Sequence, residues 1–348
     1  MFNFLRFINK VLKVIIPIPR IIVRSNYLFR KYYKNKSKNL SVKKKTVIFM
    51  SDEIFHYGLG LTDSFRGMTM LYKVSKILNV DFKINFTSPQ NLTHYLIPNK
   101  YNWLIGENDM CYSTKYSVIF DEMLTSHPSI EALWRDYINK MDLDNILLLI
   151  KKLLKRYQQI HAYTNYCVSD KDYPVLFDEL FKPSVELQKN IDENMNKIGS
   201  DFISVTFRFQ QLLGDFTEGQ QYPILNKDEQ LFLIEKCTEH LLEIHGENAG
   251  KRILVTSDSI TFLNAVKHLD FTYIIPGRIA HMGNILETEI NVWMKSFIDY
   301  FMISNAKKIY LVIDGKMYDS GFAYRASLHN KVTYIIKKHN SCFPGFIT

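Results

Sequence analysis

The sequence has too few cysteines, set too far apart, for a disulfide framework or a zinc site. Its 4 cysteines stand at positions 111, 167, 237 and 342. Small disulfide-rich domains and structural zinc sites place their cysteines in close pairs, and this sequence has no such pair. We therefore expect free thiols in a reducing compartment, which favours a cytoplasmic location.

A long apolar run is also missing. The most apolar stretch near the start, residues 14–23, is interrupted by Pro17, Pro19 and Arg20, whereas a membrane-spanning helix needs about 20 apolar residues. Charges are scattered through this region, and no small-residue cleavage site follows an apolar core as in a signal peptide. The sequence thus predicts neither a membrane-spanning helix nor a cleaved signal peptide.

Acidic residues are absent from the first 51 positions. Of the 44 basic residues, 13 lie in this segment, which leaves 31 against all 35 acidic residues in the rest of the chain. Within residues 1–45 apolar and basic side chains mix as in an amphipathic helix at a membrane surface, although a solvated tail is the alternative. Since each basic residue near an anionic membrane contributes about 1 kcal/mol, we expect this arm to hold the protein peripherally on the cytoplasmic membrane face. Nucleic acid is not an expected partner, because the basic charge does not extend over the rest of the chain.

Beyond the arm, apolar strands alternate with amphipathic helices, which is typical of an α/β fold with doubly wound parallel sheets. With 348 residues, 47% of them hydrophobic, the chain exceeds one domain of usual size. We predict a basic arm at 1–45, one α/β domain at 46–199 and a second at 200–348. The expected strands are 46–50, 81–86, 202–208, 252–256, 273–275, 309–313 and 332–336, and the expected helices are 64–78, 130–163, 184–198, 227–245, 288–304 and two that open after 259 and near 320.

The strand at 202–208 delivers Arg208 to its carboxyl end. Ligands of open α/β sheets bind at that end of the strands. A guanidinium group stays charged at working pH and can pair two phosphate oxygens at once. An arginine that snorkels from a strand end is the alternative. Arg208 is therefore the first candidate for a phosphate-binding residue.

Two other turns follow expected strands and open expected helices. One contains Asp258 and Ser259, and the other contains Ser320, Gly321 and Phe322. Free backbone N–H groups and the positive end of the helix dipole favour phosphate at such positions. Each turn has a simpler explanation, because Asp258, Ser259 or Ser320 can cap a helix and Gly321 can permit a turn. Together with the expected strand ends, they predict one nucleotide-sized site.

Further candidates follow the first expected strand. Gly58 and Gly60 permit a tight turn near a ligand, and Arg66 lies about one turn into the next helix. Two glycines alone are not specific for a dinucleotide site, and Arg66 could be a solvated helix residue. The Asp-X-Asp sequence at 142–144 occurs in metal-dependent sugar transferases, but here it suits the acidic first turn of a helix. We predict no metal site.

In this order, the motifs resemble the α-1,2/α-1,6/protein-O-fucosyltransferase superfamily, particularly its nodulation-type and α-1,6 members. They are Gly58-Leu59-Gly60 with Arg66, Ile203-Ser204-Val205-Thr206-Phe207-Arg208, Thr256-Ser257-Asp258-Ser259, Asp299 with Ser304, and Ser320-Gly321-Phe322. The resemblance spans most of residues 46–330. It implies a GT-B fold, in which two Rossmann-like domains face a cleft, the first on the acceptor side and the second on the nucleotide-sugar side. It further implies a GDP-fucose donor, inversion at the anomeric carbon, and no metal or other cofactor.

The resemblance also implies roles for single residues. Arg208 would bind the β-phosphate, Asp258 would lie on the nucleotide side, and Asp299 would read guanine. The turn 320–322 would meet the diphosphate. This sequence departs from the family at two positions: Thr206 replaces a histidine that helps to hold guanine, and Phe209 stands where a second arginine is usual. The first departure puts the base specificity in doubt.

The implied reaction is a single displacement in which Arg208 stabilises the leaving diphosphate. Asp215, on the loop after Arg208, is the first candidate for the base that takes the acceptor proton, and Glu218 is the second; Asp215 could instead brace that loop. We expect transfer of fucose from GDP-fucose to a glycan, such as a lipid-linked glycan, in surface polysaccharide or glycolipid synthesis. The alternatives are a transferase for another GDP- or UDP-sugar and a non-catalytic, membrane-associated nucleotide-sugar-binding protein.

Overall fold

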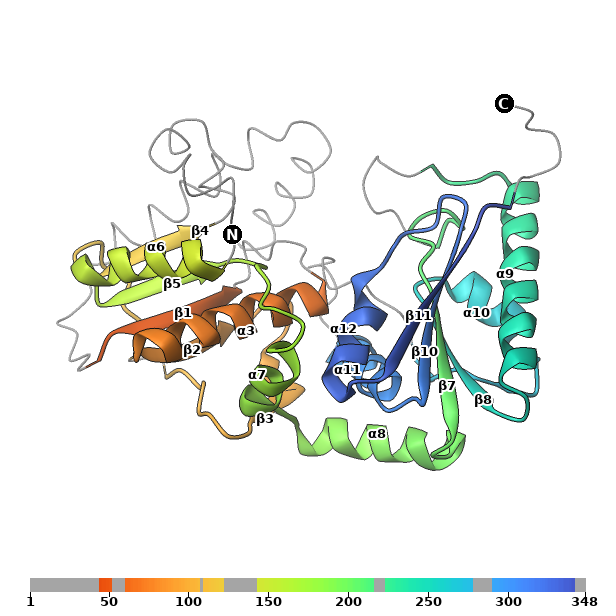
Figure 1. Ribbon diagram of the computed structural model, residues 1–348, viewed down its shortest axis with the longest axis horizontal. Helices are drawn as coiled ribbons and strands as arrows, with labels where there is room; N and C mark the ends of the chain where they lie inside the picture. Colours follow the sequence, from red (N-terminus) through yellow and green to blue (C-terminus); the bar gives the residue numbers. More distant parts are fainter. Residues whose placement is uncertain are drawn as a thin grey trace. The chain divides into compact units, whose positions relative to one another are not determined.

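The computed structural model describes residues 44–51, 60–106, 109–121, 143–215, 223–277 and 290–341 (Figure 1). All statements below concern these residues. Most of the basic arm, Gly58 and Glu218 lie outside them, so the predictions made for these positions stay predictions.

The chain divides into two compact units. The first comprises the described residues up to Leu92 and those in Pro98–Lys182; the second comprises Thr93–Ile97 and the described residues from Pro183 onward. The expected boundary at 199 followed the helix at 184–198. In the structure this helix, α8 (Val185–Ile198), belongs to the second unit because it packs against α11 (Ile290–Ser304).

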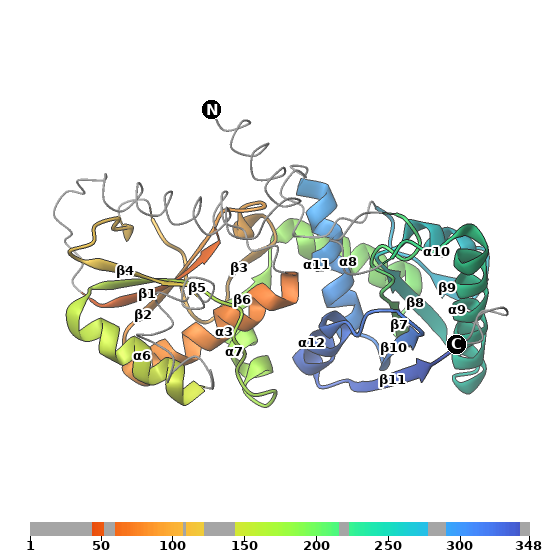
Figure 2. The same ribbon diagram turned by 90° about the horizontal axis from the view of Figure 1, so that it is seen from above.

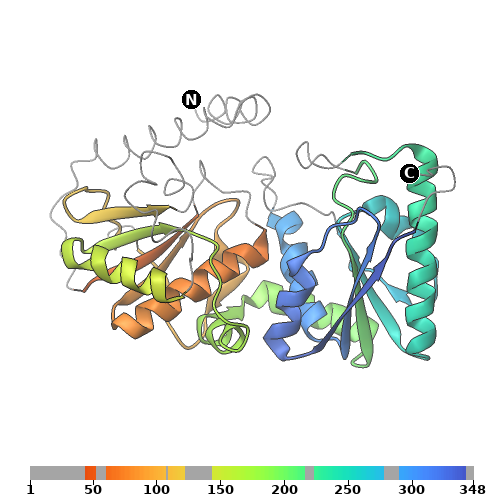
Figure 3. The same cartoon turned by 45° about the horizontal axis from the view of Figure 1, so that its top comes forward.

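The first unit is built on a parallel sheet with strand order β2-β1-β5-β4. Its strands are β1 (Thr46–Ser51), β2 (Asp81–Phe86), β4 (Ser117–Asp121) and β5 (Gln159–Tyr163), and its helices are α3 (Leu61–Leu78), α6 (Leu143–Arg156) and α7 (Tyr173–Leu180). Strand β1 is buried along its whole length, as is usual in parallel sheets. Helices α3 and α6 lie side by side on one face of this sheet (Figures 1 and 3).

Short elements complete the path between the two units. The 3₁₀ turn η1 (Leu92–His94) leads to β3 (Leu96–Pro98), which pairs with β6 (Phe181–Pro183) in a two-stranded sheet. Strand β6 directly follows α7, and Ser184 then caps α8 by accepting a hydrogen bond from the Leu187 amide.

The helix predicted at 130–163 extends too far, because its last residues form a strand. Helix α6 stops at Arg156, and β5 follows at Gln159–Tyr163. All five residues of β5 are buried, and Ile160 lies between β1 and β4 in the sheet. The leucine and lysine pattern favours a helix locally, but burial between two strands decides the conformation of this segment.

The second unit contains a five-stranded parallel sheet with strand order β11-β10-β7-β8-β9. Its elements after α8 are β7 (Phe202–Phe207), α9 (Lys227–Glu247), β8 (Arg252–Ser257), α10 (Ile260–Val266), β9 (Thr272–Tyr273), α11, β10 (Lys308–Asp314), α12 (Gly321–Asn330) and β11 (Thr333–His339). Helices α9 and α10 cover one face, and α11 and α12 cover the other (Figures 1 and 2).

This strand order makes β7 the central strand. From β7 the chain moves outward through β8 to β9, then returns to the other side of β7 for β10 and β11. The order therefore reverses between β7 and β10. In doubly wound sheets, ligands bind at the carboxyl ends of the strands beside such a reversal. The fold thus predicts a ligand site at the loops that follow β7 and β10.

The two faces of β7 differ in character. Ile203, Val205 and Phe207 belong to a buried apolar cluster with residues of α9 and α10, and the Phe207 ring lies 4.5 Å from that of Phe262. Successive strand residues point to opposite faces, so Ser204 and Thr206 face the other way. Burial of each large apolar side chain contributes about 1.5–3 kcal/mol, so this cluster anchors the central strand.

Candidate functional site

Arg208 directly follows β7, and its side chain is held by Asp258 at the end of neighbouring β8. Arg208 Nη1 lies 2.8 Å from Asp258 Oδ2. The backbone amides of Phe209 and Gln210 donate to Asp258 Oδ1 and Oδ2 at 2.8 and 2.7 Å. Asp258 therefore fixes both the guanidinium and the backbone that follows it.

Burial dominates the electrostatics of this pair. The Asp258 side chain is 4% exposed and that of Arg208 is 16% exposed. Burial raises the pKa of Asp258, while Arg208 and the two backbone amides act in the opposite direction. A guanidinium keeps its charge under these conditions, so Arg208 is a fixed cation at the sheet edge.

The surroundings of Phe209 explain why a second arginine, usual in the family the sequence resembles, is missing at this position. Its ring is fully buried and lies 5.0 Å from the ring of Phe262 on α10. The apolar cluster thus takes the side chain, and only the amide of Phe209 faces Asp258. A second arginine at this position would place a charge in that cluster, which is costly without a partner.

The loop between β10 and α12 joins the same edge. The Tyr318 amide donates to the Arg208 carbonyl at 3.0 Å. Ser320 caps α12, its hydroxyl accepting a hydrogen bond from the Phe322 amide at 3.3 Å. A Cβ at Gly321 would meet no atom within 4 Å, so the start of α12 is open there. The loops after β8 and β10 therefore both contact the loop after β7. Their role as one nucleotide site stays a prediction.

Asp215 and Ser259 meet at the start of α10. Ser259 caps the helix, accepting from the Phe262 amide at 3.0 Å and donating to Asp215. Asp215 Oδ1 also accepts from the Thr261 amide at 3.2 Å and its hydroxyl at 2.7 Å. These bonds attach the loop that carries Asp215 to the start of α10, which agrees with the alternative that Asp215 braces that loop. Its role as a base stays a prediction.

Thr206 and Asp299 are both held by other side chains. The Thr206 hydroxyl lies 2.8 Å from that of Thr256, opposite it on β8, and both residues are buried. Both carboxylate oxygens of Asp299, on α11, accept from Lys295 Nζ at 2.8 Å. Burial raises the pKa of Asp299, and the Lys295 charge opposes this.

Lys295 was not predicted as a site residue from the sequence. Its position four residues before Asp299 on a helix is nevertheless the spacing at which oppositely charged side chains form an ion pair. Its side chain is 5% exposed. Gly277, with φ +126°, lies against it, and a Cβ there would be 3.2 Å from Lys295 Cδ. Gly277, at the end of the described residues after β9, therefore packs against the Lys295 side chain.

Gly60 and Arg66 lie in the first unit. Gly60 stands at the start of α3, and Arg66 forms an ion pair with Asp63 one turn before it, at 2.8 Å. These contacts are local to α3. A role for either residue toward a nucleotide stays a prediction.

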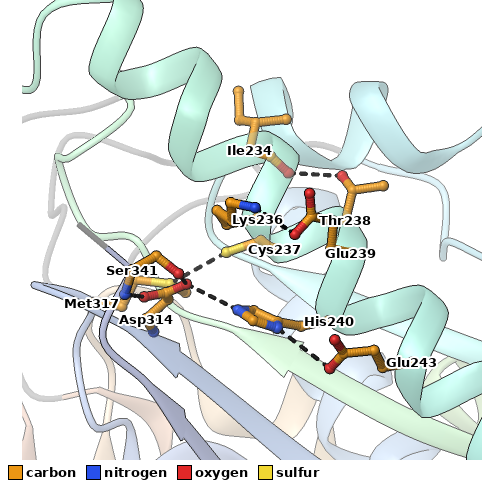
Figure 4. Close-up of polar contacts among 10 residues, drawn as sticks. All are labelled: Ile234, Lys236, Cys237, Thr238, Glu239, His240, Glu243, Asp314, Met317 and Ser341. Atoms are coloured by element: carbon orange, nitrogen blue, oxygen red, sulfur yellow. Dashed lines mark hydrogen bonds and ion pairs between the residues drawn. The ribbon is translucent and has the colours of Figure 1, made fainter. Parts of the chain in front are cut away.

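A second buried polar cluster supports the β10–α12 loop (Figure 4). Asp314, at the end of β10, accepts from His240 Nε2 at 2.9 Å and from the hydroxyl and amide of Ser341 at 2.6 and 2.7 Å. Burial would raise the pKa of Asp314, but the bonds from Ser341 and His240 outweigh it and lower the pKa. The ring of His339 stacks on that of His240 at 3.5 Å. Asp314 thereby joins α9 and Ser341, which follows β11, to the end of β10, where this loop begins.

Among the described residues, no group of three His, Cys, Asp or Glu is placed to hold a metal ion. None of the helices searched over those residues is both long and apolar enough to cross a membrane.

The chain matches no protein-family model and no curated protein sequence, but solved structures do match. NodZ α-1,6-fucosyltransferase soaked with GDP-fucose aligns with a TM-score of 0.51 and 13% identity, over 82% of this chain and 92% of that one. NodZ from Bradyrhizobium gives a TM-score of 0.50 and 14% identity over 82% and 93% of the two chains. Arabidopsis thaliana FUT1, solved as a mutant with GDP, gives 0.54 and 9% over 90% and 78%.

This chain has the fucosyltransferase fold. The predicted GT-B class, with two Rossmann-like units, is confirmed, and so is the predicted resemblance at the level of the fold. Since one fold supports several chemistries, the activity has to be argued from the site.

Proposed function

We propose that this chain is a glycosyltransferase that uses a nucleoside diphosphate sugar, with GDP-fucose as the donor. The observation that carries the proposal is Arg208, held by Asp258 beside the reversal of strand order in the second unit. A fixed cation at that edge suits a diphosphate. The fold likeness to NodZ soaked with GDP-fucose and to FUT1 with GDP supports the choice of donor.

The proposed reaction is a single displacement with inversion at the anomeric carbon. Negative charge develops on the β-phosphate as the bond to the sugar breaks, and a fixed guanidinium stabilises that charge without reorganisation. Asp258 keeps Arg208 in place, and the start of α12 adds N–H dipoles at the same ends of the strands. These groups supply the positive charge that a metal ion supplies in metal-dependent transferases, so we propose a metal-independent reaction.

Asp215 remains the proposed base. Its contacts with Ser259 and Thr261 place it at the start of α10, beside the turn that holds Asp258. A carboxylate oxygen has two lone pairs. Asp215 Oδ1 already accepts two hydrogen bonds from Thr261, but Oδ2, which accepts one from Ser259, can still accept from an acceptor hydroxyl. Glu218 follows as the second proposal.

A different nucleotide sugar is the second candidate donor, and the Lys295–Asp299 pair favours it. The family resemblance assigns guanine to Asp299, but both carboxylate oxygens of Asp299 are bonded to Lys295. Thr206, in place of the family histidine, is bonded to Thr256. Both positions that would read guanine are therefore engaged within the protein.

Thermal unfolding with GDP, UDP, CDP and their sugars decides between the donors. A ligand present at about 100 times its dissociation constant stabilises the folded state by about 2.7 kcal/mol. GDP and GDP-fucose should raise the melting temperature more than the uridine and cytidine compounds. A larger shift with UDP-sugars would favour the second candidate, and no shift with any compound would count against a nucleotide-sugar site.

For the acceptor we propose a glycan carried on a lipid, reached from the cytoplasmic membrane face through the basic arm at 1–45. The absence of acidic residues before Asp52 supports this placement. Deletion of residues 1–40 should reduce partition to vesicles that contain anionic lipid, while vesicles of neutral lipid bind neither form. Unchanged partition after the deletion would contradict the membrane role.

A further inference from the structure

Gln210, two positions after Arg208, has an unusual backbone conformation. Its φ is +54°, in the left-handed region that residues with a Cβ rarely adopt. The hydrogen bond from its amide to Asp258 Oδ2, at 2.7 Å, holds it there. Such conformations persist where the surrounding structure enforces them, and they concentrate at functional sites.

The side chain of Gln210 is also unusual. The residue is only 7% exposed, and its Oε1 is a buried acceptor without a hydrogen-bond partner in the described part of the chain. Buried polar side-chain atoms are nearly always bonded, so an orphaned acceptor requires an explanation. The neighbouring Gln211 is similarly buried, at 5% exposed, but makes an interaction of its own. Of these two neighbouring glutamines, only Gln210 has a buried side-chain oxygen without a hydrogen-bond partner among the described residues.

The same carboxylate, that of Asp258, fixes Arg208 and the backbone of Gln210. A ligand bound to Arg208 therefore lies close to Gln210. Because Oε1 can only accept, its partner must carry a proton. The diphosphate of a nucleotide sugar carries none at neutral pH, whereas hydroxyl groups flank it on the sugar and on the ribose.

We propose that Gln210 is a donor-binding residue whose Oε1 accepts a hydrogen bond from a hydroxyl of the nucleotide sugar. This inference rests on the proposed function and adds a contact to it. It accounts for both features of Gln210: the enforced backbone places the side chain, and the substrate satisfies the acceptor.

The variant Gln210→Met tests the proposal, because methionine has nearly the same volume but lacks the acceptor. Without ligand, the variant should melt at the same temperature as the parent or higher, since it removes an unsatisfied buried oxygen. GDP-fucose should bind it about tenfold more weakly in calorimetric titration, the loss expected for one hydrogen bond. A purely structural role predicts the opposite pair of results, with lower stability and unchanged binding.

Two ligands distinguish the source of the hydroxyl. If the ribose supplies it, Gln210→Met should bind both GDP and GDP-fucose more weakly than the parent does. If the transferred sugar supplies it, the variant should bind only GDP-fucose more weakly. The matched control is Gln211→Met, which should lose stability and keep the affinity of the parent. Equal affinity of parent and Gln210→Met for both ligands would overturn this inference alone. Absence of binding to the parent would overturn the proposed function along with it.

Discussion

Replacing Arg208 with lysine separates the charge of this side chain from its shape. Lysine keeps the positive charge, and its Nζ can still pair with Asp258. A single nitrogen, however, cannot hold the carboxylate and two phosphate oxygens in one plane as a guanidinium does. Arg208→Lys therefore tests the planar set of N–H donors alone, and Arg208→Ala tests the charge and these donors together.

The expected magnitudes follow from the number of bonds lost. A hydrogen bond to a charged group contributes about 1.5–3 kcal/mol. Loss of one such bond to the leaving diphosphate in Arg208→Lys should lower kcat/KM about 10-fold to 100-fold, and loss of two in Arg208→Ala should lower it at least 100-fold.

Stability separates the two variants. The Asp258 side chain is 4% exposed, and removing one partner of a buried ion pair costs about 3–5 kcal/mol. The amides of Phe209 and Gln210 still bond Asp258, so Arg208→Ala should lose about 3 kcal/mol, at the lower end. Arg208→Lys retains an ion pair and should lose much less, which makes it the cleaner variant for kinetics.

The assay is release of GDP from GDP-fucose, with urea unfolding of each variant. The matched control is Arg252→Lys. Arg252 is the first residue of β8, at the end of the strand opposite Asp258, and it donates a hydrogen bond to the Lys197 carbonyl. The control should keep the turnover of the parent. If Arg208→Lys and Arg208→Ala both stay within about tenfold of the parent, the phosphate-binding role of Arg208 is refuted.

The remaining predictions concern three buried or bracing carboxylates. Lys295→Met leaves Asp299 without its ion-pair partner and should lower the free energy of unfolding by about 3 kcal/mol in urea, whereas adding Asp299→Leu should recover most of this loss; no recovery would contradict the pairing. The lowered pKa of Asp314 means that its stabilisation is present above the unfolded-state pKa of about 4 and is lost as pH falls through the folded-state pKa. The stability gap between the parent and Asp314→Asn should therefore be constant above about pH 5 and shrink as the pH falls from there to about 2; a gap that stays constant down to about pH 2 would argue against this. Asp215→Asn keeps an acceptor oxygen for Thr261, so it should stay folded yet lose at least about 100-fold in turnover as the proposed base; turnover near that of the parent would leave Asp215 only its bracing role.

The second unit was predictable in most of its elements, because its strands are short apolar runs and its helices carry clear caps. The expected strand at 202–208 and helix at 227–245 match β7 and α9 closely. Arg208 also stands at the strand end, as predicted. These features depend on local sequence alone.

Contacts that join distant segments were not predictable in the same way. Asp258 was expected on the nucleotide side, but its bonds to Arg208 and two amides depend on β7 and β8 being neighbours in the sheet. The left-handed Gln210 depends on those bonds in turn. Segment β5 was assigned to a helix because its burial between two strands is not visible in the local pattern.

The central claim is that the loops at the carboxyl ends of β7 and β10 bind a nucleoside diphosphate. Calorimetric titration of GDP into the full-length protein and into Arg208→Ala tests it most directly. The account predicts one GDP site per chain in the parent and an affinity at least about 100-fold weaker in the variant. Absence of GDP binding by the parent, or equal affinity in the two proteins, would contradict it.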